Sequence, residues 1–258
     1  METTQEYESA IKLIRERRST RRFRPDPIPD GYVEKILEAA RWAMSGANSQ
    51  PWEFMVVRDA KIRDELYTAY IDINSEYMFW MERQRYAELR HPTHQLAGTD
   101  QQQYEKKRAA QGWKNAPVLI VVLGDGRKQW GTVVGGLTFG RGMTHLTDGL
   151  ANACTNIHLA AAALGLGSQW VTIHIQEPFK RILGVPDLLM LHSIIPIGYP
   201  SVERGPGYRR EPAAMVHYDT YDMNKYLTND KFIDYLKELR ANTIPHYAQT
   251  HGKRRPAE

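Results

Sequence analysis

Residues 145–175, HLTDGLANACTNIHLAAAALGLGSQWVTIHI, change from a helical pattern to an extended one without an intervening linker. The first part is rich in small residues and is typical of a long helix. It stops at Gly165 and Gly167, and glycine commonly ends a helix. The part from Ser168 to Ile175 is typical of a strand. We therefore expect a long helix that leads directly into a sheet.

The rest of the chain also mixes helices and strands. Helical spacing of apolar residues predicts helices within 6–18, 29–44 and 229–243. Asp30 is the expected N-cap of the second of these. Apolar runs that end at turn residues predict strands at 52–58, 117–125 and 192–200. Because the strands and helices do not alternate strictly, the pattern favours an α+β fold over a doubly wound one.

The composition is that of a globular protein, with 42% hydrophobic and 25% charged residues among 258. The formal net charge of +4 fits an anionic ligand and does not by itself indicate nucleic acid. A single cysteine, Cys154, excludes an internal disulfide and favours a reducing compartment. The first residues lack the apolar region of a signal peptide, and the longest apolar run is too short to span a membrane. We expect a cytoplasmic protein without membrane contacts.

The stretch RERRSTRRFRPDPIPD, residues 15–30, holds six arginines within ten residues. Guanidinium groups bind phosphate oxygens in a bidentate manner, and a serine hydroxyl adds a further donor. A helix is expected to give way to an extended segment here. At this point four side chains could converge on one phosphate, those of Arg17, Arg18, Ser19 and Arg21. The alternative is a solvated basic helix end that interacts with its own dipole. The residues alone do not decide between the two.

Three other stretches are candidates for ligand contacts. The loop MSGANSQPWEF is rich in small donors and acceptors, the strand within GLGSQWVTIHI ends in a hydroxyl, and the stretch near residue 210 carries two arginines. Taken singly, the loop is more typical of a turn, the stretch near residue 210 is more typical of a surface loop, and the hydroxyl also fits a strand edge. The residues concerned are Ser45, Gly46, Asn48, Thr172, Arg209 and Arg210.

Motifs for a nucleophile, a nucleotide cradle or a metal are missing from the sequence. There is no GxxxxGK[ST], no HExxH, no CxxC and no clean GxGxxG after a strand. The histidines show no ligand spacing, so we expect no metal. His158 is typical of a core or interface histidine, and Cys154 of a small core residue. An enzyme with none of these groups indicates that a cofactor carries the chemistry.

Taken together and in this order, the motifs resemble those of the nitroreductase family of FMN-dependent oxidoreductases. The resemblance runs from RRSTRRF through ARWAMSGANSQPWEFMVV, NAPVLIVVLGD and DGLANACTNIHLAAAALGLGSQWV to IIPIGYP and RREP, or most of the chain. It implies an α+β fold with a mixed central sheet flanked by helices. It also implies an intertwined homodimer whose C-terminal segment crosses to the partner. We therefore expect a single domain over 1–258 with a C-terminal arm at 219–258.

The resemblance also implies how FMN is held. The expected contacts to the phosphate and ribityl chain are Arg17, Arg18, Ser19 and Arg21, with Arg210 closing from the far end and Arg209 as a further candidate. The expected contacts from the other subunit are Ser45, Gly46 and Asn48. Flavin N5 would be met by Thr172, the expected catalytic residue, and by the backbone of Ile173. Some relatives have Glu-Gly at that place. The candidates for contact with flavin O2 are Arg108 and Gln111.

Residues 67–113 are longer and more aromatic than the corresponding part of typical relatives. We expect a helical lid that covers the flavin and holds a planar aromatic substrate. The alternative is that many of these rings are core residues of two helices. The spacing of Glu82, Tyr86 and Lys107 resembles the zwitterion-binding lid of iodotyrosine deiodinases. With Trp80, these are the candidate lid residues.

The predicted function is the reduction of a nitroaromatic, a quinone or a halogenated phenol, with NADH or NADPH as reductant. Hydride would pass through flavin N5 in two half-reactions at one site, so ping-pong kinetics are expected. The alternatives are a reductive dehalogenase, an oxygen-using flavin enzyme, and a flavin-binding protein without turnover. Binding of nucleic acid is disfavoured, because the arginines are followed by the acidic, stiff PDPIPD and not by stacking aromatic residues.

Overall fold

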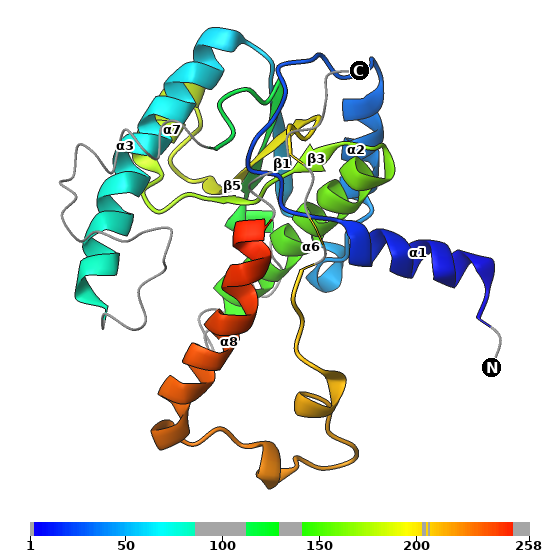
Figure 1. Cartoon of the computed structure of the whole chain (residues 1–258). Helices are drawn as coiled ribbons and strands as arrows, with labels where there is room; N and C mark the ends of the chain where they lie inside the picture. Colours follow the sequence, from blue (N-terminus) through cyan, green and yellow to red (C-terminus); the bar gives the residue numbers. More distant parts are fainter. Residues whose placement is uncertain (1–2, 86–111, 129–140, 203–204, 206, 250–258) are drawn as a thin grey trace. The chain divides into compact units, whose positions relative to one another are not determined.

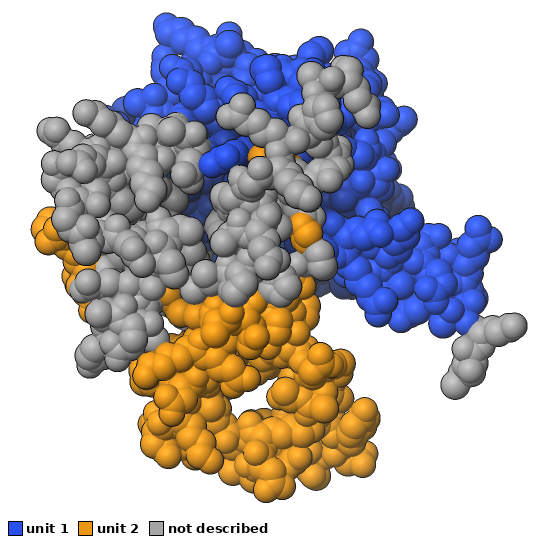
Figure 2. All heavy atoms as spheres, in the orientation of Figure 1, with its two compact units in different colours: residues 1–78, 100–201 blue, residues 79–99, 202–258 orange. Residues whose placement is uncertain are grey.

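The computed structural model describes residues 3–85, 112–128, 141–202, 205 and 207–249. The chain divides into two compact units, which Figure 2 colours separately. The first unit comprises Met1–Met78 with Asp100–Ser201, and the second comprises Phe79–Thr99 with Val202–Glu258. The central sheet lies in the first unit.

The sheet has five strands (Figure 1). β1 (Trp52–Val57) pairs with β2 (Val118–Gly124), and β2 pairs with β5 (Met190–Gly198). β5 also pairs with two short strands, β3 (Gly167–Ser168) and β4 (Val171–Thr172). The expected α+β class is confirmed. All four ladders are antiparallel, and the parallel pairing among the described residues is confined to two isolated bridges, Ser19–Ser168 and Arg22–Gly112.

β3 and β4 occupy the place where the sequence predicts one strand. They keep one register along β5, since Ser168 lies opposite Ile197 and Val171 opposite Ile194. In this register the gap between them falls opposite Ile195 and Pro196. Proline has no N–H for a ladder, which gives a physical reason for a break at this point. β5 has a second irregularity at His192, where its pairing with β2 shifts by one residue.

β2 is buried along its whole length because both faces of the sheet are covered. Its even-numbered residues from Val118 to Val122 pack into one apolar cluster, and its odd-numbered residues from Leu119 to Leu123 pack into another. Side chains alternate between the faces of a strand, so a strand covered on both sides is a continuous apolar run. The sequence VLIVVLG has this pattern.

Two pairs of helices cover the two faces of the sheet (Figure 1). α2 (Tyr32–Arg41) and α6 (Arg141–Ala163) contribute to the first cluster. The beginning of α3 (Ala60–Gln84) and α7 (Glu177–Leu183) contribute to the second. α3 starts in the first unit and ends in the second, because the division falls after Met78. α7 was not among the helices expected from the sequence.

The first two helices begin as their local sequence requires, with one correction. α1 (Gln5–Glu16) has Thr4 as its N-cap, and the Thr4 hydroxyl accepts from the backbone N–H of Tyr7 at 3.2 Å. α2 was expected to begin at an Asp30 cap. The prediction was wrong, because the N-cap is Gly31, which has a φ of 78° and no side-chain cap. Glycine adopts this left-handed conformation without a steric cost.

The second unit contains the short helical turns η6 (Pro212–Ala214) and η7 (Met223–Lys225), followed by α8 (Asn229–Gln249). Its segment between residues 215 and 232 is unusual in how many large apolar side chains it exposes. These are Met215, Val216, Tyr218, Tyr221, Met223, Tyr226, Leu227 and Phe232. Within the part of the chain that the structure describes, no helix is both long and apolar enough to cross a membrane.

Candidate functional site

The arginine-rich segment is attached to one edge of the sheet. The backbone N–H of Thr20 donates to the carbonyl of Ser168 at 2.8 Å, and Ser19 forms an isolated bridge with the same residue. Further along, the N–H of Arg24 donates to the carbonyl of Tyr199 at 2.9 Å. The segment therefore runs as an extra extended strand beside the short strand β3 and the end of β5.

A glycine allows the close approach at β3. A Cβ atom at Gly167 would lie 2.3 Å from Oγ1 of Thr20 and 2.7 Å from its Cβ, well inside van der Waals contact. Thr20 is itself buried. Only glycine at position 167 leaves room for the segment to lie this close to the sheet.

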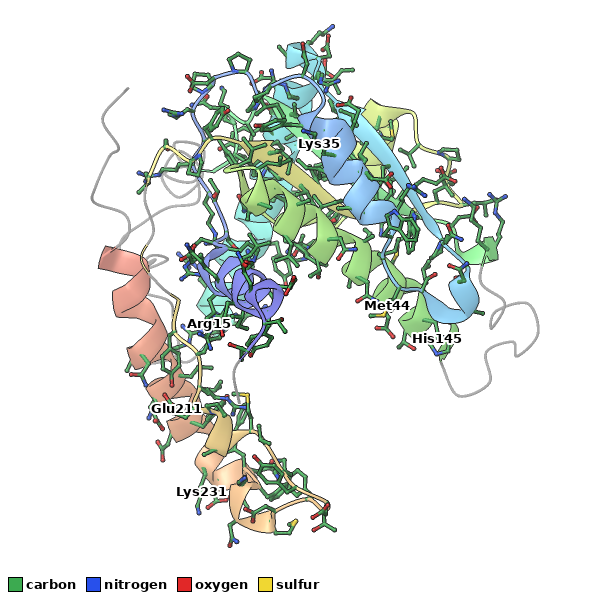
Figure 3. All side chains as sticks on the ribbon, turned by 90° about the vertical axis from the view of Figure 1, so that its right-hand side faces the viewer. Arg15, Lys35, Met44, His145, Glu211 and Lys231 are labelled. Atoms are coloured by element: carbon green, nitrogen blue, oxygen red, sulfur yellow. The ribbon has the colours of Figure 1, made fainter. Side chains whose placement is uncertain are left out.

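The arginines at the end of α1 interact with their own helix, which is one of the two roles that the sequence left open. The guanidinium of Arg18 donates to the carbonyl of Arg15, which is labelled in Figure 3, and to that of Arg17 at 2.8 Å. Such bonds satisfy carbonyls at a helix C-terminus. The positive charge of Arg17 also acts on His158, a buried residue of α6. The basic segment thus caps its helix and brings charge to the edge of the sheet.

Two buried polar side chains, those of His158 and Ser168, contact each other next to this segment. Nδ1 of His158 is 2.7 Å from Oγ of Ser168, and both residues are buried. The indole of Trp170 stacks on the His158 ring, with 6.0 Å between centroids, and meets the ring of His192 edge-on at 5.4 Å. Burial lowers the pKa of His158 to about 4, and the nearby charge of Arg17 adds to this effect. The imidazole is therefore neutral at neutral pH.

Ser45, Gly46 and Asn48 lie in a tight loop between α2 and β1. The loop contains the short turn η1 (Gly46–Asn48), and Oγ of Ser45 accepts from the backbone N–H of Gln50 at 3.0 Å. Three residues that are not glycine have a positive φ in it: Ala47 at 52°, Asn48 at 51° and Gln50 at 46°. Left-handed conformations at such residues are strained and occur often at functional sites.

α6 contacts both this loop and the preceding helix α2 through small and polar side chains. Nδ2 of Asn152 donates to the carbonyl of Met44 at 3.0 Å, and Nδ2 of Asn156 donates to that of Ala39 at 2.9 Å. A Cβ atom at Gly149 would lie 3.3 Å from Cβ of Ser45, so the helix and the loop are in close contact. Met44, labelled in Figure 3, and Trp42 stay exposed beside the loop, at 77% and 72% of their surface.

The strand end expected to face flavin N5 is open. Exposure alternates along the chain here: Val171 is buried, Thr172 exposed, Ile173 half-buried and His174 exposed. The His174 ring stacks on Tyr77 of α3, with 4.1 Å between centroids and 26° between planes. Sequence reasoning missed His174, because a lone histidine after a strand carries no motif. The contact brings an aromatic residue of the expected lid segment to the end of β4.

Phosphate-binding and N5-contacting candidates lie on the same edge of β5. Ser168, which bonds to the arginine segment, is opposite Ile197, and Thr172 is opposite Ser193. The separation is four residues, or roughly 13 Å at about 3.3 Å per residue. An extended ligand can therefore reach both ends of this edge.

The aromatic residues of the expected lid, 67–113, do not share one environment. Tyr67 is buried and packs edge-on against Trp113 at 5.0 Å, and Tyr70 lies 5.6 Å from the same ring. These rings belong to the core, which bears out the alternative for them. Tyr77 and Trp80 are exposed by 44% and 51%. The side chain of Glu82 and all of Tyr86, Lys107, Arg108 and Gln111 lie outside the described residues.

Arg209 and Arg210 belong to the second unit. The guanidinium of Arg209 donates to the carbonyl of Tyr208 at 2.8 Å, and that of Arg210 donates to the hydroxyl of Tyr235 on α8 at 3.3 Å. The Arg210 guanidinium also lies 5.7 Å from the centroid of the Tyr235 ring. The expectation that both arginines join the Arg17–Arg21 segment at one phosphate stays a prediction.

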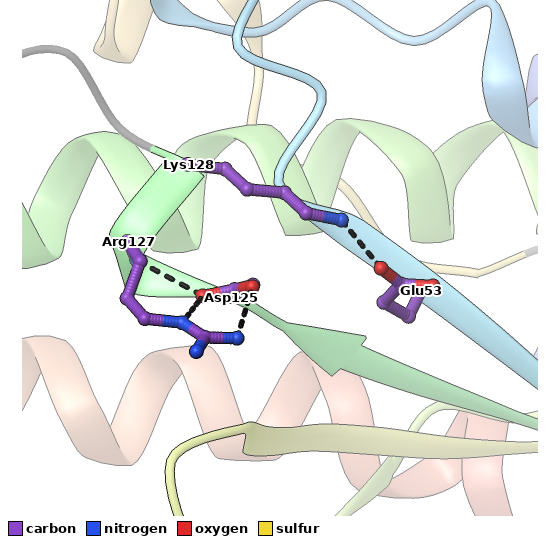
Figure 4. Close-up of polar contacts among 4 residues, drawn as sticks. All are labelled: Glu53, Asp125, Arg127 and Lys128. Atoms are coloured by element: carbon purple, nitrogen blue, oxygen red, sulfur yellow. Dashed lines mark hydrogen bonds and ion pairs between the residues drawn. The ribbon is translucent and has the colours of Figure 1, made fainter.

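Two ion pairs lie where β2 ends, beside β1 (Figure 4). Asp125 is buried and accepts two bonds of 2.9 Å from the guanidinium of Arg127, and these hydrogen bonds lower the pKa of the carboxyl. The N–H of Asp125 donates to the carbonyl of Pro51 at 2.8 Å, and Lys128 pairs with Glu53 on β1. This group attaches the end of β2 to Pro51, which follows the Ser45–Asn48 loop, and to β1.

Two further observations concern metals and nucleophiles. The residues that the structure describes include no group of three or more His, Cys, Asp or Glu side chains placed to hold a metal ion. Cys154 is buried, with Sγ 3.4 Å from Oγ of Ser193, and burial raises its pKa to about 11. A thiol with this pKa stays protonated at neutral pH, so Cys154 is a core residue and not a nucleophile.

The family model described as the nitroreductase family matches residues 14–199. This match includes the arginine segment, the Ser45–Asn48 loop, the whole sheet and the strand end at Thr172. The chain therefore belongs to the nitroreductase family, as the motifs indicated.

Individual proteins agree with this assignment. The chain is 29% identical over 213 residues to an NADH dehydrogenase of Thermus thermophilus, a match that covers 81% of this chain and 95% of the relative. It is 24% identical over 217 residues to an iodotyrosine deiodinase of Thermotoga neapolitana, covering 81% and 97%. It shares its fold with a crystal structure of oxidised iodotyrosine deiodinase bound to FMN and 3-iodo-L-tyrosine. That comparison has a TM-score of 0.60 at 22% identity, and covers 82% of this chain and 99% of the other.

Proposed function

We propose that this chain binds FMN and uses NADH or NADPH to reduce a small aromatic electrophile. The observation that carries the proposal is the edge of β5. There the arginine segment is bonded to Ser168, and Thr172 stands exposed four residues further along. Relatives with FMN in their structures, and relatives named for NADH, support the cofactor and the reductant.

The residues of this edge fit the parts of FMN. The guanidiniums of Arg17, Arg18 and Arg21 suit a phosphate dianion, and the hydroxyl of Ser19 adds a donor. Oε1 of Gln169, between β3 and β4, is buried without a hydrogen-bond partner among the described residues. A buried acceptor of this kind fits a hydroxyl of the ribityl chain, because an unsatisfied buried oxygen is costly.

FMN, when bound, supplies hydride transfer between the nicotinamide and the oxidant. The chain supplies position and electrostatics. The hydroxyl of Thr172 and the N–H of Ile173 would donate to the flavin at N5, and the arginines would hold the phosphate. The stacked pair Tyr77 and His174 would border the place where an aromatic substrate lies.

The site is proposed to be shared between two subunits. Ser45, Gly46 and Asn48 would reach the flavin of a second copy, and the C-terminal arm, 219–258, would cross to that copy. The exposed side chains of Trp42 and Met44 beside the loop support a covered surface there. The exposed apolar residues between 215 and 232 support the same role for the arm.

The experiment is anaerobic reduction and reoxidation of the purified protein. We expect a yellow protein whose flavin absorbance is bleached by NADH or NADPH under nitrogen. It should be restored by a nitroaromatic or a quinone in a separate second step. If neither NADH nor NADPH reduces the flavin, the protein binds flavin but does not have this activity. Comparing the two nicotinamides decides the reductant.

Reductive dehalogenation is the second candidate. It is favoured by the deiodinases, which match this chain over most of their length in sequence and in fold. The residues proposed to hold a zwitterionic halotyrosine are Glu82, Tyr86 and Lys107. Variants Glu82→Gln and Lys107→Met should then lose halotyrosine turnover and keep quinone reduction. If these variants keep halotyrosine turnover as well as quinone reduction, reductive dehalogenation by these residues is excluded.

A further inference from the structure

We propose that His158 is a positioning residue of the phosphate-binding segment Arg17–Arg21 and that it acts through Ser168. This inference rests on the proposed binding of FMN. It assigns a role to a buried histidine that the sequence would place among ordinary core residues.

The segment depends on a very short strand. β3 has two residues, and one of them, Ser168, accepts the Thr20 N–H that attaches the segment to the sheet. Two paired residues at the edge of a sheet define a position only weakly. A small rotation of β3 would therefore move Ser19 and its neighbouring arginines with it.

His158 fixes this strand from the side of α6. Its Nδ1 is 2.7 Å from Oγ of Ser168, and the ring is held by the stacked indole of Trp170. Ser168 is thus tied in two directions, by its side chain to α6 and by its carbonyl to Thr20. The contact of Gly167 with Thr20 leaves the segment no room to move inwards.

His158 also suits the charge of the segment. Burial and the charge of Arg17 keep its imidazole neutral, so it adds no cation of its own. The positive charge of the arginines is left to a phosphate, while the imidazole serves as a neutral hydrogen-bonding partner of Ser168.

The test compares FMN with riboflavin, which lacks the phosphate. Binding of each is measured by titration of the apoprotein with wild type, Ser168→Ala, His158→Leu and His158→Asn. Losing one buried hydrogen bond should weaken FMN binding by about fivefold to tenfold in Ser168→Ala and His158→Leu. Riboflavin binding should change by less than about twofold, which is the size of effect expected for a substitution away from the groups that bind the ligand. His158→Asn, whose amide can replace Nδ1, should recover most of the FMN affinity.

A matched control lies one turn earlier on α6. Cys154→Ala removes another buried contact between this helix and the sheet, to Ser193, without touching the segment. It should leave both affinities unchanged. The inference is overturned if the histidine and serine variants weaken both flavins in proportion, or if Asn and Leu at 158 act alike. Wild-type protein that binds neither flavin would instead end the proposed function.

Discussion

The backbone N–H of Thr20 donates a 2.8 Å hydrogen bond to the carbonyl oxygen of Ser168. The two residues are remote in sequence, yet this bond places the arginine segment beside the strands that lead to Thr172. In the proposed complex, the phosphate end and the reactive end of FMN are both positioned by the edge of β5. In that complex, phosphate affinity and hydride transfer would depend on separate residues, which can be tested separately.

Phosphate recognition predicts an uneven effect of arginine substitutions. Arg18→Ala and Arg210→Ala should each weaken FMN binding by tenfold or more, since a charge-assisted contact contributes about 1.5–3 kcal/mol. Arg24→Ala should have little effect, because Arg24 lies beyond Phe23, where the segment is bonded to Tyr199 and not to Ser168. Titration of the apoproteins with FMN measures this. Similar losses at all three positions would indicate a diffuse basic patch.

A shared site predicts complementation between two defective subunits. Arg18→Ala and Asn48→Ala homodimers should both bind FMN weakly. If each site takes Arg18 from one subunit and Asn48 from the other, a mixed dimer has one doubly defective site and one intact site. Co-expression with two different tags isolates the mixed dimer, which should bind one FMN with wild-type affinity. Two equally weak sites in that dimer would place both residues in the same subunit.

The continuous helices and strands of the fold were predictable from the sequence, but the interruption of a strand was not. The apolar run of β2 and the periodicity of α2 were sufficient to predict both, since each element satisfies one local pattern. The break between β3 and β4 was missed because Pro196, which lies opposite, is remote in sequence. Periodicity could not separate buried Tyr67 from exposed Tyr77, because both occur on the same helix and differ in which neighbour they meet.

In the candidate site, too, the sequence pointed to the residues that a local pattern marks and missed those defined by contacts between distant segments. The arginines and the Ser45–Asn48 loop stand out by composition, and the family match spans them. The roles of Gly167 and His158 depend on contacts with Thr20 and Ser168, which form only when distant segments meet. No local pattern marks such residues.

The buried His158 predicts a loss of stability in mild acid. Its pKa is lowered from 6.5 to about 4 in the folded state, chiefly by burial, so unfolding takes up a proton between these values. The free energy of unfolding should be unaffected above pH 6.5 and fall by up to about 3 kcal/mol towards pH 4. Denaturant titrations of wild type and His158→Gln at several pH values measure the difference.

His192 contributes in the same direction, because burial also lowers its pKa. The comparison with His158→Gln removes this contribution, since His192 is present in both proteins. The variant should show a smaller dependence on pH between 6.5 and 4. Parallel curves for the two proteins would show that His158 is not held neutral by its surroundings.

The exposed rings of α3 should affect one half-reaction more than the other. Tyr77→Ala should lower kcat/KM for an aromatic oxidant more than the rate of reduction by the nicotinamide, because the nicotinamide stacks mainly on the flavin. Tyr67→Ala is the matched control from the same helix. It should cost about 3–5 kcal/mol of stability, as large-to-small changes in a core do. Stopped-flow measurements of both half-reactions, with thermal melts, separate the two roles.

Titration of the apoprotein with FMN, followed by light scattering of the product, tests the central claim most directly. The account predicts saturable binding of one FMN per subunit, in a dimer that FMN stabilises by mass action. Riboflavin should bind more weakly, because it lacks the group that the arginine segment holds. A protein that shows no saturable binding of FMN, or that carries FMN as a monomer at micromolar concentration, would contradict the account.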